Sequence, residues 1–280
     1  MIQAEQKRHP LVTALLYLAL AVTCVFMLLP GLWALATSFK TEGAVLATPP
    51  QWIPHPITLE NYQRVLASNM PRYYLNSMIL ALATIGAVLT VAVHAGYACA
   101  RFDFRGKNLY LLLIIGTMMI PGVANIVPLY ILGNLLGLLD TYLFLVLVYS
   151  VWMVPMIIWL MKGFFESIPS NLEQAAMVDG YSRWYAFYRI ILPLSKPGLA
   201  AAAILVFVYV WNEFIMALTF TSSDQMRTVS VGLRYYVTSY GIQWGELTAA
   251  VTLALLPVTV FFLILQRQFI AGMIAGAFKG

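Results

Sequence analysis

The chain has 280 residues, of which 61% are hydrophobic and 10% charged, and its formal net charge is +5. Ordinary soluble domains are about 45–50% apolar and about 25% charged, so this composition excludes a soluble globular protein and favours one embedded in a lipid bilayer. The two cysteines, Cys24 and Cys99, lie within apolar stretches, which argues against a disulfide framework and for buried thiols.

Six apolar stretches are long enough to cross a bilayer as helices, which takes roughly 20 mainly apolar residues. The expected fold is therefore all-α: one polytopic membrane domain over residues 1–280 with six transmembrane helices. The spans are expected at about 11–36, 73–100, 108–132, 141–162, 199–220 and 247–267. Pro121 and Pro128 each remove a backbone donor from the third span, so we expect that helix to bend.

Between the first two spans, residues 37–72 contain several prolines and aromatic side chains. Proline disfavours regular helix, and aromatic rings with a polar edge are enriched at the boundary between membrane and water. We therefore expect an irregular external cap that rests on the bilayer. The rings expected to anchor it are Trp52, Tyr62, Tyr73 and Tyr74.

The segment 163–198, between the fourth and fifth spans, is interrupted by polar residues, and its local chemistry predicts two short helices joined by a hinge. Ser170 and Glu173 have the spacing of a capping box, in which each side chain satisfies a backbone N–H at the start of a helix. Gly180 can adopt a left-handed backbone and suits the position just past the end of that helix. Ser182 is expected to cap the second helix.

The second helix is expected to present one apolar face, because four apolar side chains recur at helical spacing. These residues are Trp184, Phe187, Tyr188 and Ile191, and Pro193 should end the helix. Two interpretations of the segment follow from this pattern. It is either an amphipathic loop that lies on the membrane surface, or a rigid knob that another protein grips.

The order Gln174-Ala175-Ala176, Gly180 and Ile190-Ile191-Leu192-Pro193 resembles the EAA loop in the membrane subunits of ATP-binding-cassette (ABC) importers. In that family the loop is the coupling helix, which docks into a cytoplasmic ATPase subunit. The resemblance implies that the ATPase-docking residues are Glu173, Gln174, Ala175, Ala176, Asp179 and Gly180. The chain departs from the family pattern at Gln174, where the family usually has Glu, while Glu173 stands one residue earlier.

Further motifs resemble the sugar-importer branch of this family, most closely the shorter, six-span partner of maltose-type systems. They include Asn76-Ser77, Trp211-Asn212-Glu213-Phe214 and the ending Gly276-Ala277-Phe278-Lys279-Gly280. The resemblance implies three kinds of partner in a bacterial inner membrane: a homologous second permease, two ATPase subunits that bind ATP and Mg²⁺, and an extracytoplasmic sugar-binding protein. The chain itself is expected to contact membrane lipid and to bind no cofactor and no nucleic acid.

The distribution of basic residues indicates an orientation. With the N-terminus in the cytoplasm, eleven Lys and Arg residues fall on inside segments and five on outside segments, and cytoplasmic segments are the ones that carry such an excess. Both termini and the segment 163–198 are therefore expected in the cytoplasm. The inside residues are Lys7, Arg8, Arg101, Arg105, Lys107, Lys162, Arg183, Arg189, Lys196, Arg267 and Lys279; the outside residues are Lys40, Arg64, Arg72, Arg227 and Arg234.

The sequence contains no catalytic or metal-binding spacing. His9, His55 and His94 are far apart, and no phosphate-binding GxxxxGK[ST] motif is present. The chain is therefore not expected to be an enzyme, and active transport would draw its energy from a partner or from an ion gradient. His94 lies inside an apolar helix, where a hydrogen bond to a neighbouring helix is the expected role.

Glu213 is the one carboxylate placed well inside an expected span, and intramembrane charges are candidates for function. Together with Trp211 and Asn212 it would offer a sugar an aromatic plane, an amide and a carboxylate, which predicts a site on the translocation pathway. A hydrogen-bonded anchor between helices is the other interpretation. The alternative function is an ion-coupled secondary transporter with Glu213 and His94 as relay groups. Such transporters normally show repeated halves, which this sequence lacks.

Residues 221–246, between the fifth and sixth spans, form a polar loop rich in tyrosine. By the family resemblance this loop would reach into the docked binding protein. The predicted contacts are Tyr235, Tyr236 and Tyr240, because aromatic side chains are common anchors of protein interfaces. An aromatic belt lying on the lipid headgroups is the other interpretation.

Overall fold

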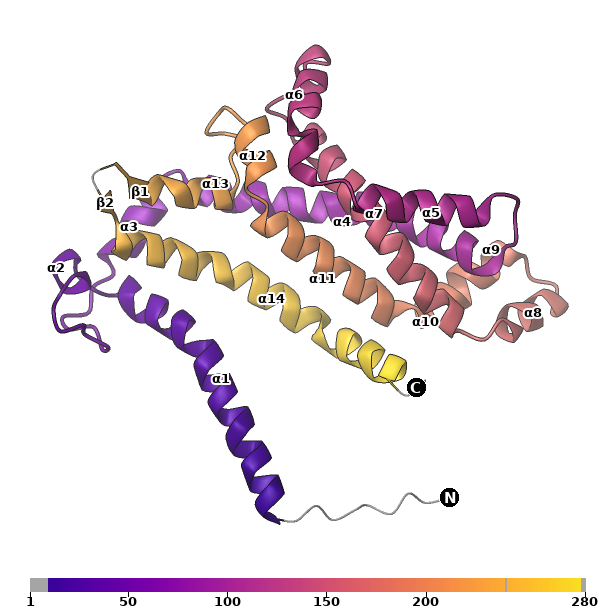
Figure 1. Cartoon of the computed structure of the whole chain (residues 1–280), viewed down its shortest axis with the longest axis horizontal. Helices are drawn as coiled ribbons and strands as arrows, with labels where there is room; N and C mark the ends of the chain where they lie inside the picture. The colour runs from indigo at the N-terminus through magenta and orange to yellow at the C-terminus, as the bar shows by residue number, and fades with distance from the viewer. Residues whose placement is uncertain (1–9, 240, 278–280) are drawn as a thin grey trace. The chain divides into compact units, whose positions relative to one another are not determined.

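The computed structural model describes residues 10–239 and 241–277. Within them the regular secondary structure is helical apart from one pair of two-residue strands, as Figure 1 shows. The long helices are α1 (Pro10–Ser38), α4 (Met70–Arg101), α7 (Tyr142–Ser167), α11 (Lys196–Asn212) and α14 (Trp244–Ala277). The all-α fold class is confirmed.

Shorter elements connect the long helices. They are α2 (Glu42–Val45), α3 (Glu60–Ala67), α5 (Lys107–Met118), η1 (Gly122–Asn125), α6 (Ile126–Leu135), α8 (Asn171–Val178), α9 (Arg183–Ala186), the π-helix η2 (Phe187–Ile191), α10 (Leu192–Leu194), α12 (Ile215–Phe220), α13 (Val229–Leu233), η3 (Arg234–Tyr236), β1 (Val237–Thr238) and β2 (Gly241–Ile242). The strands pair antiparallel, with Val237 opposite Ile242.

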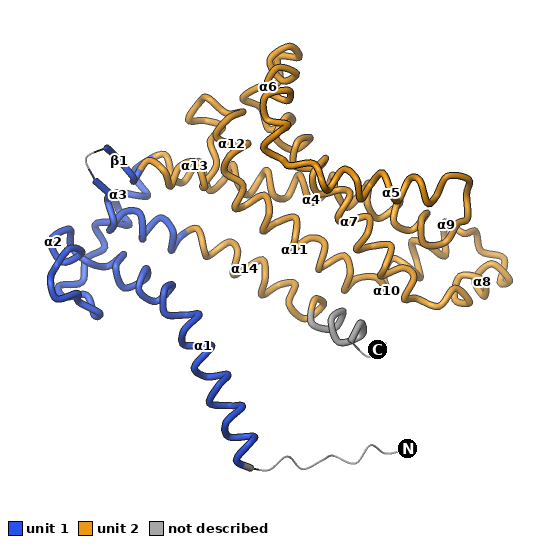
Figure 2. The backbone as a smooth tube through the Cα atoms, in the orientation of Figure 1, with its two compact units in different colours: residues 1–68, 236–253 blue, residues 69–235, 254–280 orange. Residues whose placement is uncertain are grey.

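The chain divides into two compact units, which Figure 2 colours separately. Unit 1 comprises residues 1–68 and 236–253, and unit 2 comprises residues 69–235 and 254–280.

Among the described residues, four helices are individually long and apolar enough to cross a membrane: Leu11–Ser38, Met70–Arg101, Tyr142–Ser167 and Trp244–Phe269. Two bent pairs qualify if each pair is one span. They are Lys107–Met118 with Gly122–Leu135, bent by 90°, and Arg183–Leu194 with Lys196–Asn212, bent by 70°. The chain is thus a multi-pass membrane protein by length and composition, and the count of six spans stays a prediction.

Pro121 lies at the sharp bend of the region expected as the third span. α5 ends at Met118, and Pro121 has extended backbone (ψ 128°) just before η1 begins. The bend expected at this proline is confirmed. Pro128, in contrast, continues the helix, because it is the third residue of α6 and the first turn of a helix uses no backbone N–H within the helix.

The region expected as the fifth span, 199–220, is interrupted. α11 ends at Asn212, Glu213 is extended (φ −66°, ψ 127°), and α12 begins at Ile215. Apolar residues flank Asn212 and Glu213 on both sides, so the sequence pattern predicted one continuous span and not the interruption.

α4, α7 and α11 pack together in unit 2 through small residues. A Cβ at Gly96 of α4 would lie 3.0 Å from the Cβ of Met161 and 3.1 Å from the backbone nitrogen of Lys162, both on α7. A Cβ at Gly198 of α11 would lie 2.6 Å from the ring of Phe164. The alanines 200–203 that follow are also buried. Small residues of this kind let helix backbones approach closely in membrane proteins.

In unit 1, the chain that follows α1 folds back onto α3. The Asn61 amide donates to the carbonyls of Ser38 and Lys40, at 2.9 Å each. The Lys40 ammonium lies 3.9 Å from the centre of the Trp33 ring, which is a cation–π contact.

Residues 37–72 are more regular than the sequence predicted, because α2 and α3 both form within them. Pro49, Pro50, Pro54 and Pro56 instead occupy the non-helical stretch between these two helices, and Pro71 lies in the first turn of α4. Of the rings expected on the bilayer, Trp52 is 63% exposed, whereas Tyr73 is buried within α4 of unit 2.

Candidate functional site

The segment between α7 and α11 turns at Gly180, which separates α8 from α9. Gly180 has a φ of +88°, and its N–H donates to the Met177 carbonyl at 3.1 Å. The Tyr181 N–H donates to the Ala176 carbonyl at 3.0 Å. These two bonds form a Schellman motif, which requires a left-handed residue at the position of Gly180. The predicted hinge is confirmed.

The two predicted helix caps had different outcomes. Ser182 caps α9 as predicted, since its Oγ accepts from the Tyr185 N–H at 3.2 Å. The capping box predicted at the start of α8 is wrong, because Ser170 makes no side-chain cap bond and the Glu173 side chain is turned into the protein.

Glu173 instead forms a buried ion pair that ties α8 to the end of α4. The Nε of Arg101 donates to Oε1 of Glu173 at 2.6 Å, and the Tyr97 hydroxyl donates to Oε2 at 2.9 Å. A second guanidinium nitrogen of Arg101 donates to the Ile168 carbonyl at 2.8 Å. The Arg101 and Glu173 side chains are only 9% and 5% exposed. A charge-assisted network of this kind fixes the position of α8.

The same segment carries large exposed apolar side chains. The Tyr181 and Tyr185 rings stack at 4.3 Å, and the Trp184 and Tyr188 rings stack at 6.1 Å. Together with Val178, which is 87% exposed, we call these residues the aromatic patch. Exposed sets of aromatic residues are typical of surfaces that bind another protein.

The apolar face predicted for the second helix divides into two. Phe187 and Ile191 are fully buried, whereas Trp184 and Tyr188 belong to the exposed aromatic patch. Each of these pairs is spaced by four residues, and the two pairs lie on different sides of a helix that changes from α to π at Phe187. Pro193, expected to end the helix, lies within α10 instead.

His94 makes the interhelical hydrogen bond that the sequence predicted. Its Nε2 lies 2.8 Å from the Tyr188 hydroxyl, and its Nδ1 lies 2.6 Å from the Thr90 carbonyl. Both ring nitrogens are therefore engaged, one of them by the aromatic patch.

Glu213 lies at the break between α11 and α12. Its Oε1 accepts from the Met216 N–H at 2.8 Å, and its Oε2 accepts from the Ala217 N–H at 2.9 Å and from the Tyr149 hydroxyl at 3.0 Å. Its backbone carbonyl accepts from the Ser230 hydroxyl. Glu213 thus caps α12 and is bonded to α7 and α13.

The two neighbours of Glu213 differ in exposure. Trp211 is 4% exposed, and its ring stacks on Phe207 at 5.4 Å. Asn212 is exposed, and its amide donates to the Val208 carbonyl at 2.8 Å. The predicted aromatic plane is therefore buried in the core, and of the three predicted residues only Asn212 is exposed.

Comparison with known protein families identifies the chain. Residues 89–274, which include both α8 and Glu213, match the family described as binding-protein-dependent transport system inner membrane component. The chain belongs to this family. It is thus a permease, the non-catalytic membrane component of a transport system.

Relatives of the permease match it over nearly its whole length. It is 36% identical to the sulfoquinovosyl glycerol transport system permease protein SmoH of Agrobacterium fabrum, over 94% of this chain and 93% of that one. It is 35% identical to the trehalose/maltose transport system permease protein MalG of Thermococcus litoralis, over 93% and 94%. A crystal structure of a bacterial ABC transporter that imports the acidic polysaccharide alginate shares the fold, with a TM-score of 0.80 at 22% identity, covering 93% of this chain and 97% of that one.

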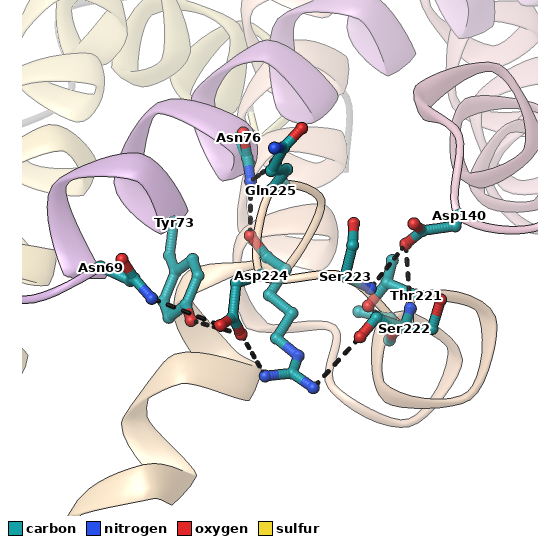
Figure 3. Close-up of polar contacts among 11 residues, drawn as sticks. Asn69, Tyr73, Asn76, Asp140, Thr221, Ser222, Ser223, Asp224 and Gln225 are labelled. Carbon is teal, nitrogen blue, oxygen red and sulfur yellow. Dashed lines mark hydrogen bonds and ion pairs between the residues drawn. The ribbon is translucent and has the colours of Figure 1, made fainter.

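Residues 221–227 of the permease are held by polar side chains, as Figure 3 shows. The Asn76 amide donates to the carbonyls of Gln225 and Arg227, at 2.8 Å each, and its oxygen accepts from the Tyr142 hydroxyl at 2.6 Å. Asp224 accepts from the Tyr73 hydroxyl at 3.1 Å and pairs with Arg227. Asn76 itself is fully buried, so these bonds are shielded from water.

Asp140, which sequence reasoning missed, holds the start of the same loop (Figure 3). It has a φ of +61°, and its Oδ1 accepts from the N–H groups of Ser222 and Ser223 at 2.9 and 3.1 Å. Burial alone would raise the pKa of Asp140, but the hydrogen bonds from Ser223 and Ser222 and the charge of Arg227 outweigh it and hold the pKa below its ordinary value. The available signal was an Asp in a short turn between apolar stretches, since Asp tolerates a left-handed backbone.

The three tyrosines predicted to contact a binding protein differ in position. Tyr235 is 49% exposed, and the Arg227 guanidinium lies 5.0 Å from its ring centre in unit 2. Tyr236 is buried in unit 1. Tyr240 lies outside the described residues. Of the described pair, only Tyr235 has a freely accessible ring.

Proposed function

We propose that the permease is the membrane subunit of an ATP-driven, binding-protein-dependent sugar importer. The names of two relatives, permeases of a sulfoquinovosyl glycerol and of a trehalose/maltose transport system, support a sugar as the solute. The observation that carries the proposal is the segment 168–195: a rigid, internally braced projection with an exposed aromatic patch. Transmission of force between subunits needs such a projection, because a flexible loop would absorb the movement.

The proposed docking surface is the exposed side of this segment. Gln174, Ala175, Asp179 and Gly180 are exposed and lie beside the aromatic patch in sequence, so they are proposed to contact an ATPase subunit directly. Glu173 and Ala176 are buried, and their role in docking becomes an internal one. Glu173 braces α8 through Arg101, and Ala176 supplies the carbonyl that closes the turn at Gly180.

The remaining partners follow from this function. The importer would contain a homologous second permease, two ATPase subunits that hold ATP and Mg²⁺, and an extracytoplasmic sugar-binding protein. The six-span topology, with coupling loop 163–198 and both termini in the cytoplasm, is supported by the excess of basic residues on those segments. ATP-driven closure of the ATPase pair would then move α8 and, through the buried ion pair, α4, so that the pathway opens to one side at a time.

On the translocation pathway, Asn212 is the residue whose exposure supports contact with sugar. On the outer surface, Tyr235 is the proposed contact with the binding protein, because its ring is accessible and lies next to Arg227. Aromatic rings beside arginine are common anchors at protein interfaces.

The alternative, an ion-coupled secondary transporter, is not favoured by the geometry of its two relay candidates. The Glu213 carboxylate is occupied by two backbone N–H groups and the Tyr149 hydroxyl. His94 is bonded through both ring nitrogens. A proton or sodium relay needs a group that exchanges partners with water or an ion during transport.

Photo-crosslinking in the assembled complex tests the proposed docking surface. A photoreactive amino acid at Gln174, or at Val178 in the aromatic patch, should form adducts with the ATPase subunit. The matched control is the same amino acid at Ile57, which is 70% exposed but lies on the segment proposed to face outward. Adducts to the ATPase from Ile57, with none from Gln174 or Val178, would reject both the docking surface and the orientation.

A further inference from the structure

The break between α11 and α12 is built by one residue. All the hydrogen bonds described for the Glu213 carboxylate go to protein donors: the N–H groups of Met216 and Ala217 and the hydroxyl of Tyr149. A carboxylate at the start of a helix takes the place of the missing backbone acceptors and interacts favourably with the helix dipole. α12 has only six residues, and so short a helix is not stable without such support.

Tyr149 connects this cap to the core. It is fully buried on α7, so its hydroxyl cannot reach solvent or a solute, and its bond to Oε2 is its link to Glu213 at 3.0 Å. On the other side of the break, the Ser230 hydroxyl donates to the Glu213 carbonyl and ties the same residue to α13. Glu213 is thus the point where α7, α12 and α13 are joined.

The chain that follows α12 is attached to α4 and to the turn before α7. The Asp140 N–H donates to the Phe220 carbonyl at 2.8 Å, and the fully buried Asn76 of α4 holds two carbonyls of the loop. The Ser77 hydroxyl accepts from the Val229 N–H at 2.9 Å. Apart from Ser230 of α13, the anchors named here for residues 213–229 lie on α4, on α7 and on the turn before α7. Figure 3 shows two of them, Asn76 and Asp140.

We infer that Glu213 and Tyr149 form a positioning pair, which seats α12 on α7. With the loop 221–229 held by α4, the whole segment then moves with α4 and α7 during transport. In this inference Glu213 does not touch the sugar. The inference rests on the proposed function, since it assigns to the pair a role in transport by the assembled importer. Asn212, one residue before the break, then marks the point where α11 can change its angle to α12.

Tyr149→Phe is the decisive variant, because it removes one hydroxyl from a ring that no sugar can reach. In vesicles containing the whole complex, Tyr149→Phe and Glu213→Gln should both lower the maximal uptake rate, by about tenfold if one charge-assisted hydrogen bond is lost. The concentration of sugar-loaded binding protein that gives half-maximal uptake should stay unchanged. The double variant should be no worse than the more severe single variant, because both changes break the same link.

Tyr209→Phe is the matched control. The Tyr209 ring packs edge-on against Tyr149 at 6.2 Å, but its hydroxyl is not among the described hydrogen-bond partners of Glu213. The complex with Tyr209→Phe should take up sugar at the wild-type rate. Glu213→Asp retains the charge and should recover part of the rate that Glu213→Gln loses.

Hydrogen exchange at Met216 and Ala217 gives a second readout that does not depend on transport. These two amides should exchange about tenfold faster in Glu213→Gln and in Tyr149→Phe than in the wild type, with α4 unaffected. If the wild-type complex shows no ATP-dependent uptake, the proposed function fails, while this exchange still tests the pair. The inference is overturned if Tyr149→Phe behaves as the wild type while Glu213→Gln alters sugar affinity, or if both variants only reduce the yield of complex.

Discussion

The buried pair between Arg101 and Glu173 should be the main brace of the projection, and Arg101→Met tests this. Methionine retains the apolar stem of arginine but leaves the Glu173 carboxylate 5% exposed and without its cation. Breaking a buried pair in this way costs about 3–5 kcal/mol. Two opposite charges about 4 Å apart interact by a similar amount, about 4 kcal/mol, at an effective dielectric constant near 20. The free energy needed to unfold α8 locally should therefore fall by about 3–5 kcal/mol.

The double variant Arg101→Met with Glu173→Met should be less damaging than Arg101→Met alone. It removes both charges, so no buried ion lacks a partner. The Tyr97 hydroxyl and the Ile168 carbonyl lose their partners, at about 1 kcal/mol each. The expected cost is therefore about 2 kcal/mol, and the difference from the single variant measures the penalty of the unpaired carboxylate.

The assay is hydrogen exchange of the α8 amides in the complete importer in lipid. A change of about 3–5 kcal/mol in local opening corresponds to exchange that is roughly 200 to 5,000 times faster. The control is Lys162→Met, which breaks the i,i+4 pair with Glu166 on the surface of α7, where the Glu166 side chain is 47% exposed and about 0.5 kcal/mol is expected. If Arg101→Met changes exchange no more than Lys162→Met does, the buried pair does not brace α8 and the reasoning is refuted.

Three further predictions concern single positions. Gly180→Val should strain the left-handed turn by about 1–2 kcal/mol and impair ATP-driven uptake while the helices still insert. Gly180→Asn should impair uptake less, because Asn tolerates this backbone conformation better. Normal ATP-driven uptake by the valine variant would count against the hinge. Gly96→Ala should lower the melting temperature of the complex, because its Cβ meets the α7 backbone at 3.1 Å, while Gly86→Ala, which meets nothing within 4 Å, should not. Asp140→Ala should speed amide exchange at Ser222 and Ser223, and Asp140→Asn should do so less. Because the pKa of Asp140 lies below its ordinary 3.8, its contribution should be constant from pH 8 to pH 5 and be lost only in stronger acid; a loss between pH 7 and pH 5 would contradict this.

Local backbone chemistry was predictable from the sequence. Gly180, Ser182 and Pro121 act through their own backbone or through residues two or three positions away, so their roles follow from residue type and spacing alone. The hydrogen bond of His94 to another segment followed from a single polar side chain in an apolar helix, which must find a partner. The identity of that partner, Tyr188, did not follow.

Partners distant in sequence were the part that could not be predicted. The Glu173 carboxylate could bond to the nearby backbone in a capping box or to the distant Arg101. It bonds to Arg101, because a charged donor forms the stronger hydrogen bond. Glu213 looked like a charge in the middle of a helix, because nothing in its neighbourhood reveals that the helix ends there and that Tyr149 donates to it. Trp211 looked available to a sugar because the burial of its ring depends on the packing of α11.

The measurement that tests the proposed function most directly is sugar uptake by lipid vesicles that contain the permease with its second permease and ATPase subunits. Uptake of radiolabelled sugar should require ATP on the side of the aromatic patch and the sugar-binding protein on the other side. It should persist when ionophores collapse the proton and sodium gradients, and Tyr185→Ala in the patch should reduce it. Uptake that needs an ion gradient, and proceeds without ATP or binding protein, would contradict the proposed function.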